Sequence, residues 1–239
     1  MRIETLYKPY FIFKGINSLD MGIVTTSLPD IVRAERRVEK VTIPGRNGDL
    51  TIDEGSYSNY TLTLEAAIIK RANIDKICAW LDGEGEAIFS TEPDKVYKVR
   101  IANQISIGKM LQYFQKFQVN FDTFPFKYSV NANDDVIDSL ENDTTIFNKG
   151  TVYSEPKITI TGSGNVGLNI NGKEYAINNL SGSITLDSEI MEIINLGGAS
   201  YIPPSMDNYL FPRLEVGLNE ISYSGNVSKI SINPRWRWL

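Results

Sequence analysis

Large apolar and polar positions alternate along most of the chain, which is the pattern of β-strands with one buried face. Three segments show it clearly: residues 60–66 (YTLTLEA), 96–102 (VYKVRIA) and 116–124 (KFQVNFDTF). The positions expected to be buried in them are Tyr60, Leu62, Leu64, Tyr97, Val99, Ile101, Phe117, Val119 and Phe121. Shorter alternating runs, bounded by Gly, Asn, Ser or Pro, occupy the chain after about residue 150. The sequence therefore predicts a mainly β protein.

One segment departs from the alternation and predicts the one helix expected in the chain, within residues 73–85 (NIDKICAWLDGEG). Its apolar positions have the i, i+3, i+4, i+7 spacing of an amphipathic helix. They are Ile74, Ile77, Cys78 and Leu81. Asn73 is suited to cap the start, and Gly83 to end the helix in a left-handed conformation. We expect Cys78 on the buried face, as a small apolar side chain.

Polar and acidic residues accumulate between Asn131 and Asp143, and the alternation resumes at Lys157. Such a segment is typical of a domain boundary. We therefore predict two domains: residues 1–135, a β-sheet domain with the helix, and residues 136–239, an all-β domain. Closely spaced short strands with turn residues between them favour an antiparallel sandwich for the second domain over a parallel α/β sheet.

Composition narrows the possible functions. The chain has 239 residues, a formal net charge of −5, one cysteine and no histidine. The absence of histidine excludes Ser-His-Asp and Cys-His catalysis and the usual zinc-hydrolase ligand sets. The net negative charge argues against a nucleic-acid-binding protein. Glu4, Lys8 and Pro9 lie where a signal peptide would be apolar, and no apolar run approaches ~20 residues, so we expect a cytoplasmic product without a membrane span.

The segment TITGSGNVGLNINGKEY contains G-x-G-x-x-G at Gly162, Gly164 and Gly167, the fingerprint of a dinucleotide-binding loop. Such a loop requires a helix directly after it, whose N-terminus holds the pyrophosphate. Here the following residues alternate around Asn171-Gly172, which predicts a β-hairpin. We therefore interpret the glycines as a tight connection or bulge between strands and predict no cofactor.

A polar hairpin is predicted around Asn47-Gly48, in GRNGDLTIDEG. Its acidic residues do not have the spacing of an EF-hand calcium loop, so no metal site is predicted. A long protruding hairpin is well suited to reach a neighbouring subunit. The candidate subunit-interface residues are Gly45, Arg46, Asn47, Gly48 and Asp49.

Carboxylate chemistry needs no histidine, and a glycan hydrolase could draw on Glu84, Glu86, Asp94 or Asp187. Each of these residues lies beside a predicted turn, where acidic side chains are usually solvated. No catalytic residue is therefore assigned, and the hydrolase stays the less favoured alternative.

Aromatic residues mark two further candidates near the C-terminus. In NPRWRWL, Trp236 and Trp238 are expected on the buried face of a closing strand, with Arg235 and Arg237 at the surface. The loop GGASYIPPSMDNYLFPRL is the most aromatic irregular stretch. Its candidate partner-contact residues are Tyr201, Tyr209 and Phe211, which would serve a protein partner or, in a lectin-like adhesin, a glycan.

Taken in order, several segments resemble the distal tail protein family of siphophages, particularly those of Gram-positive hosts. The N-terminal ones are FIFKGINSLDMGI, IPGRNGDLTIDEGSYSNYTLTL and IDKICAWLDGEGEAIFST with DKVYKVRI. The C-terminal ones are YSEPKITITGSGNVGLNINGKEYAI, SGSITLDSE, FPRLEVGLNEISYSG and ISINPRWRWL. The resemblance extends over nearly the whole chain and rests on the order and spacing of these motifs.

The resemblance implies a tail-tube-like N-terminal domain and a galectin-like C-terminal β-sandwich. It also implies a non-enzymatic hub at the tip of the virion tail, assembled in the host cytoplasm. Such hubs are hexameric rings that join the tail tube protein to the tail-associated (tape-measure-adjacent) protein and the receptor-binding protein, with DNA only in transit through the channel. A lectin-like tail adhesin is the alternative.

Overall fold

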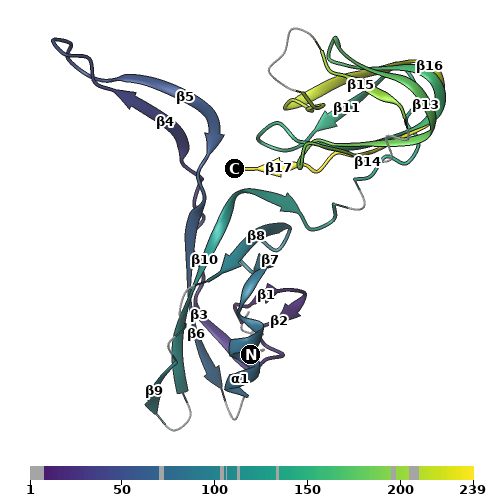
Figure 1. Ribbon diagram of the computed structural model, residues 1–239. Helices are drawn as coiled ribbons and strands as arrows, with labels where there is room; N and C mark the ends of the chain where they lie inside the picture. The colour runs from purple at the N-terminus through teal and green to yellow at the C-terminus, as the bar shows by residue number, and fades with distance from the viewer. Residues whose placement is uncertain are drawn as a thin grey trace, which may run out of the picture. The chain divides into compact units, whose positions relative to one another are not determined.

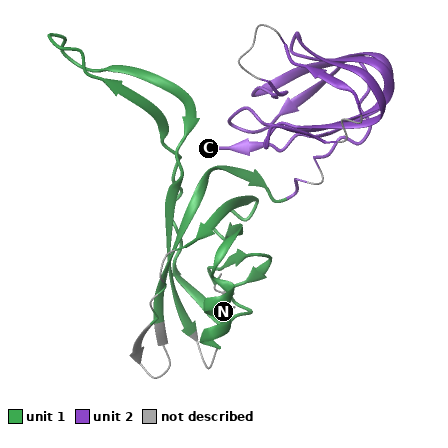
Figure 2. Cartoon of the chain, viewed as in Figure 1, with its two compact units in different colours: residues 1–130, 239 green, residues 131–238 purple. Residues whose placement is uncertain are grey.

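The computed structural model describes residues 8–69, 73–102, 105, 107–111, 114–132, 135–194, 198–204 and 210–239. The chain separates into two compact units, residues 1–130 with Leu239 and residues 131–238 (Figure 2). The division follows Val130, whereas the sequence analysis places the domain boundary after residue 135. Within the described ranges, no helix is long and apolar enough to cross a bilayer.

The first unit is built on an antiparallel sheet (Figure 1). Its strands are β1 (Phe11–Phe13), β2 (Ile16–Asn17), β3 (Ile23–Ser27), β6 (Tyr60–Ile69), β7 (Gly83–Phe89), β8 (Lys95–Ile101), β9 (Gly108–Leu111) and β10 (Phe114–Ser129). They follow the order β2-β1-β7-β8-β10-β6-β3, and β9 also pairs with β10. The long strand β10 is central: Val119 lies opposite Leu64 of β6, and Thr123 lies opposite Val99 of β8.

The alternating segments bury the side chains that the pattern predicts, except Tyr60, which is only partly buried. Leu62 and Leu64 of β6, and Val119 and Phe121 of β10, are at most 3% exposed and belong to one core cluster. Phe121 lies at the centre of this cluster, with its ring edge-on to that of Phe89 at 5.5 Å between centroids. Edge-to-face aromatic pairs of this kind add to the stabilisation from burial itself.

The predicted helix is α1 (Ile74–Trp80). Its start is confirmed, because the Asn73 side chain accepts a hydrogen bond from the Lys76 backbone N–H at 3.1 Å. Its buried face differs from the prediction. Ile77, Trp80 and Leu81 are buried, whereas Cys78 is exposed and Ile74 is 37% exposed.

Contacts of Trp80 explain why the buried face of the helix includes Trp80 and not Cys78. The ring of Trp80 stacks on Phe11 with centroids 5.4 Å apart, and its Nε1–H donates to the Phe13 carbonyl oxygen at 2.9 Å. Burial of the largest side chain of the helix, with its polar nitrogen satisfied, outweighs burial of the smaller Cys78. The helix also ends at Trp80, and Gly83, with φ +72°, begins β7 instead of capping the helix.

The second unit is an antiparallel sheet whose long strands curl around one core (Figure 1). Its strands are β11 (Thr144–Asn148), β12 (Lys157–Ile170), β13 (Lys173–Asp187), β14 (Glu192–Ile194), β15 (Ser200–Ile202) and β16 (Gly217–Asn233). The short strand β17 (Arg237–Trp238) follows along the chain and is not part of this sheet. The order is β11-β16-β12-β13-β14, and β15 also pairs with β13. Ile158 and Ile170, at opposite ends of β12, belong to the same core cluster, so the two halves of the strand enclose it from two sides.

The G-x-G-x-x-G segment lies inside β12, where the strand bends. Register shifts occur between Gly164 and Val166 against β13, and between Ser163 and Gly167 against β16. The interpretation of these glycines as a bulge is confirmed, although they interrupt a strand rather than connect two. Asn171-Gly172 forms the predicted hairpin turn between β12 and β13, with φ values of +52° and +79°.

Alanine substitutions should separate the structural requirements of the three glycines. A Cβ on Gly162 would lie 2.4 Å from the Asn226 backbone oxygen, so Gly162→Ala is expected to cost ~2–3 kcal/mol. Gly164 has open space but φ +78°, so Gly164→Ala should cost about 1 kcal/mol. Gly167→Ala serves as the control. Its Cβ would lie 2.7 Å from the Glu174 carboxylate, but this side chain can move away, so we expect the smallest loss of stability of the three variants. Urea unfolding of the three variants measures the order, and equal losses would contradict it.

Candidate interaction surfaces

The predicted hairpin is the end of a long two-stranded arm, formed by β4 (Arg36–Val41) and β5 (Leu50–Tyr57). These strands pair only with each other among the described strands, and the arm extends away from the sheet of the first unit (Figure 1). Every residue of β4, and β5 from Leu50 to Gly55, is exposed. A two-stranded ribbon in water is marginally stable by itself, so a partner surface would stabilise this one.

The two faces of the arm differ in polarity. Val41 lies opposite Leu50 and Glu39 opposite Ile52, so the side chains of these four residues share one face. Val41, Leu50 and Ile52 are 37%, 41% and 47% exposed, which leaves this mainly apolar face uncovered in the single chain. The opposite face carries Val38, Lys40, Thr51 and Asp53.

The five residues predicted as a subunit interface form the tip of the arm. Gly45, Arg46, Asn47, Gly48 and Asp49 are all exposed and lie in the connection between β4 and β5. Gly45 and Gly48 have φ +81°, a conformation that glycine adopts readily. The Thr42 hydroxyl donates to the Asp49 carboxylate at 2.9 Å and ties the two sides of the connection.

The base of the arm is fastened by charged and aromatic contacts. Arg36 and Asp53 form an ion pair at 2.7 Å across the two strands. Hydrogen bonds from Arg36, and then from the Gly55 backbone N–H, hold the pKa of Asp53 below its usual value. The Arg36 guanidinium lies 5.6 Å from the Tyr57 ring centroid, and Tyr57 packs edge-on against Phe126 of β10. These contacts set the direction in which the arm leaves the sheet.

The tip of this arm is predicted by the sequence, whereas its apolar face is not. The alternation Leu50-Thr51-Ile52 is visible in the sequence. However, the same alternation is expected of a strand buried in a sheet, and only the three-dimensional structure shows that this hairpin leaves the sheet.

The structure describes Tyr201 and Phe211 of the predicted partner-contact loop, whereas Tyr209 lies outside the described residues. The Tyr201 and Phe211 rings stack with centroids 5.8 Å apart. The Tyr201 hydroxyl donates to the Leu210 carbonyl oxygen at 2.6 Å, and burial, with a smaller contribution from Tyr175, raises the pKa of Tyr201. The Tyr201 hydroxyl therefore holds the backbone at Leu210, and among the described residues of this segment Ile202 and Leu210 are 49% and 58% exposed.

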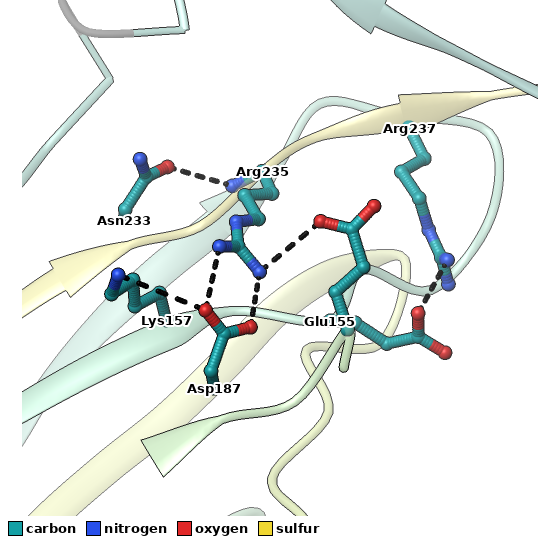
Figure 3. A network of polar contacts seen from close by, with 7 residues as sticks. Glu155, Lys157, Asp187, Asn233, Arg235 and Arg237 are labelled. Atoms are coloured by element: carbon teal, nitrogen blue, oxygen red, sulfur yellow. Dashed lines mark hydrogen bonds and ion pairs between the residues drawn. The ribbon is translucent and has the colours of Figure 1, made fainter. Parts of the chain in front are cut away.

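Close to this loop, a network of ion pairs joins segments that are distant in sequence (Figure 3). Arg235 donates to both carboxylate oxygens of Asp187, at 2.6 and 2.9 Å, and also lies 3.2 Å from Glu189. Lys157 lies 3.8 Å from Asp187. Burial by itself would raise the pKa of Asp187, but the hydrogen bonds and charge of Arg235, with the charge of Lys157, outweigh it and lower that pKa.

Arg237 is a buried cation in a separate ion pair shown in the same view (Figure 3). It is 3% exposed, pairs with Glu155 at 2.8 Å and donates to the Tyr153 carbonyl oxygen at 2.8 and 3.0 Å. The prediction that Arg237 lies at the surface is wrong. The chain turns at Arg235, which has φ +48°, so simple alternation does not continue through this segment. Trp236 is buried as predicted, at 5% exposure.

The carboxylates considered for hydrolysis do not form a shared site. Glu84 is paired with Arg100, Asp94 with Lys95 and Asp187 with Arg235. Glu86 lies exposed on β7, opposite Lys98 of β8. Within the described part of the chain, no three or more His, Cys, Asp or Glu side chains are grouped so that they could hold a metal ion.

Comparison with known proteins defines the class of the first unit. Residues 15–123 match the family model of the phage tail protein RIFT-related domain. This range includes the arm, the helix α1 and most of the sheet of the first unit. This part of the chain is therefore similar to a family of phage tail protein domains.

The whole chain shares its fold with the Dit protein of phage SPP1, described as a paradigm of the hub adsorption apparatus in phages that infect Gram-positive bacteria. The TM-score is 0.70 over 94% of this chain and 96% of that one, at 17% identity. The resemblance to siphophage distal tail proteins is thereby confirmed, as is the mainly β fold. A search of curated proteins found no match.

Proposed function

We propose that the protein is a non-enzymatic structural hub at the distal end of a siphophage tail, assembled in the host cytoplasm. The observation that carries this proposal is the shared fold with SPP1 Dit over nearly the full length of both chains. The phage tail domain at residues 15–123 supports it independently, because it is a match to a family model rather than to a fold.

In this proposal, residues 1–135 form a hexameric ring and residues 136–239 a galectin-like sandwich that carries partner proteins. The ring joins the tail tube protein to the tail-associated and receptor-binding proteins. It leaves a channel for DNA, and the net charge of −5 suits a conduit that does not retain the passing phosphates.

The arm supplies the contact between subunits. Its apolar face is Val41, Leu50 and Ile52, and its tip is the predicted interface hairpin. An interface in a ring is heterologous, meaning that one surface of a subunit meets a different surface of the next. A projecting arm that reaches onto the neighbouring copy satisfies that requirement, and covering its apolar face provides a driving force for assembly.

Light scattering coupled to size exclusion, with negative-stain imaging of the same fractions, tests the hub proposal. We expect a multimer whose images show six-fold rings with a central opening. The expectation follows from the uncovered apolar face, which favours association as the protein concentration rises. A protein that remains monomeric at high concentration would contradict the proposal.

A further inference from the structure

Two asparagines of the chain are directly followed by glycine. Asn47-Gly48 lies in the tip of the arm, and Asn171-Gly172 forms the turn between β12 and β13. Asparagine is a thermolabile residue, because the backbone nitrogen of the next residue can attack its side-chain amide. Glycine has no Cβ and leaves that nitrogen the least hindered. Both dipeptides are exposed to water, so exposure does not distinguish them.

The turn at Asn171 engages every group that would have to react. The Asn171 side-chain nitrogen donates to the Asn219 side-chain oxygen at 2.8 Å, and the Asn171 side-chain oxygen accepts from the Glu220 backbone N–H at 2.9 Å. The Gly172 backbone N–H donates to the Asn169 side-chain oxygen at 3.0 Å. Asn219 is fully buried and therefore a fixed partner. Attack of the Gly172 nitrogen on the Asn171 side chain requires these three hydrogen bonds to break.

The tip of the arm leaves the same groups free. Among the described residues, none hydrogen-bonds to the Asn47 side chain or to the Gly48 backbone N–H. The Arg46 backbone N–H donates to the Ile43 carbonyl oxygen at 3.1 Å, and this turn ends directly before the dipeptide. Gly48 has no atom within 4 Å of the position of a Cβ, so the Asn47 side chain has room to rotate toward the Gly48 nitrogen.

The reaction open to Asn47 needs no reagent except water. The Gly48 nitrogen forms a bond to the Asn47 side-chain carbonyl carbon, and the bond from that carbon to the side-chain nitrogen breaks. The released nitrogen leaves as ammonia, together with the proton that the Gly48 nitrogen gives up. The cyclic imide that results adds one water molecule and opens at either of its carbonyl groups, which yields aspartate or isoaspartate. No electrons are transferred, so neither an oxidant nor a reductant is required.

We propose that Asn47 is a site of spontaneous deamidation and that the fold protects Asn171 from the same reaction. The product carries a new carboxylate two residues from Asp49, and isoaspartate also lengthens the backbone by one carbon. The modification therefore changes the charge and the shape of the predicted interface hairpin. Its effect on assembly rests on the proposed function: the tip of an unassembled subunit is modified with time, whereas a tip covered by its neighbour is protected.

Peptide mapping by mass spectrometry tests the selectivity. The full-length protein is incubated at mildly alkaline pH, at a dilution where it sediments as a monomer, and each deamidation adds about one dalton. Each of the three hydrogen bonds should slow the reaction at Asn171 about fivefold, so we expect Asn47 to deamidate roughly 100-fold faster. Comparable rates at the two sites would overturn the proposal.

The same incubation in concentrated urea is the control for the intrinsic reactivity of the two dipeptides. Unfolding removes the hydrogen bonds around Asn171, so the two rates should become similar. A difference that persists in the unfolded chain would show that the neighbouring residues in the sequence, and not the fold, set the rates. That result would also overturn the proposal.

Asn169→Ala tests the protection directly. It frees the Gly172 backbone N–H, so Asn171 should deamidate about fivefold faster while the rate at Asn47 stays the same. Asn47→Gln is the matched variant at the tip, because glutamine forms the corresponding larger ring much more slowly. It should abolish the modification of the tip and leave the rate at Asn171 unchanged. An Asn171 rate that Asn169→Ala does not raise would contradict the proposed protection.

A comparison of dilute and concentrated protein separates this inference from the hub proposal. If the tip contacts the next subunit, Asn47 should deamidate more slowly in rings than in the monomer. Selective modification of Asn47 at equal rates in both states would support the site and reject the tip as a subunit contact. Rings formed by a protein whose monomer shows no selectivity would support the hub and reject the site.

Discussion

Leu50→Lys is expected to leave the protein monomeric at concentrations where the unchanged protein forms rings. Leu50 lies at the centre of the apolar face of the arm, opposite Val41 and two residues from Ile52. Burying a leucine contributes ~1.5–3 kcal/mol to an interface, and a lysine in its place also brings a charge that must lose water. The binding free energy of each subunit contact should weaken by about 3 kcal/mol, which raises its dissociation constant more than 100-fold. The same substitution is present at every contact of the ring.

Val38→Lys is the matched control for this experiment. Val38 is 39% exposed on the same arm but lies on the opposite face, across from Asp53, so a lysine there meets a favourable charge. Sedimentation velocity over a range of concentrations should show rings for Val38→Lys and monomers for Leu50→Lys. If both variants assemble normally, the apolar face is not the subunit contact; if both fail, the contact is not specific to that face.

Regular elements could be predicted from the sequence because their signals are local. The alternation that buries Val119 and Phe121 extends over a few residues, and the cap of α1 is formed by Asn73 and a backbone N–H three residues later. The prediction failed where a distant contact outweighed the local pattern. Trp80 reaches Phe11 and Phe13, more than 60 residues away, and this contact turns Cys78 to the surface.

The candidate surfaces depend even more on distant contacts. The apolar face of the arm has the sequence of a core strand and becomes a surface only because the hairpin leaves the sheet. A small cavity in the second unit is lined by Glu155, Ser188 and Arg213, which come from three segments of the chain. The side-chain oxygen of Ser188 is buried there without a hydrogen-bond partner among the described residues. A sequence pattern reports which residues alternate or repeat, but it does not report which buried atom lacks a partner.

Asp187→Asn is expected to produce the largest loss of stability among the changes considered, about 3 kcal/mol in the unfolding of the second unit. The side chain of Asp187 is 4% exposed and accepts two hydrogen bonds from Arg235. Loss of one partner of a buried ion pair costs ~3–5 kcal/mol because the other charge remains buried. The lower end applies here, since Arg235 is one-fifth exposed and keeps Glu189 as a second partner.

The loss should also depend on pH, with a direction fixed by the lowered pKa of Asp187. A carboxyl group whose pKa is lower in the folded protein stabilises it fully above the unfolded pKa, ~3.9 for aspartate. That stabilisation disappears as the pH falls through the folded pKa, so the difference in unfolding free energy between Asp187→Asn and the unchanged protein should shrink below about pH 4.

Glu84→Gln is the control. Glu84 and Arg100, its ion-pair partner, both have side chains that are more than half exposed, so losing this pair should cost at most ~1 kcal/mol of stability at any pH. Denaturant unfolding between pH 7 and pH 3 measures both, and a difference for Asp187→Asn that stays constant over this range would show that its charge does not stabilise the fold.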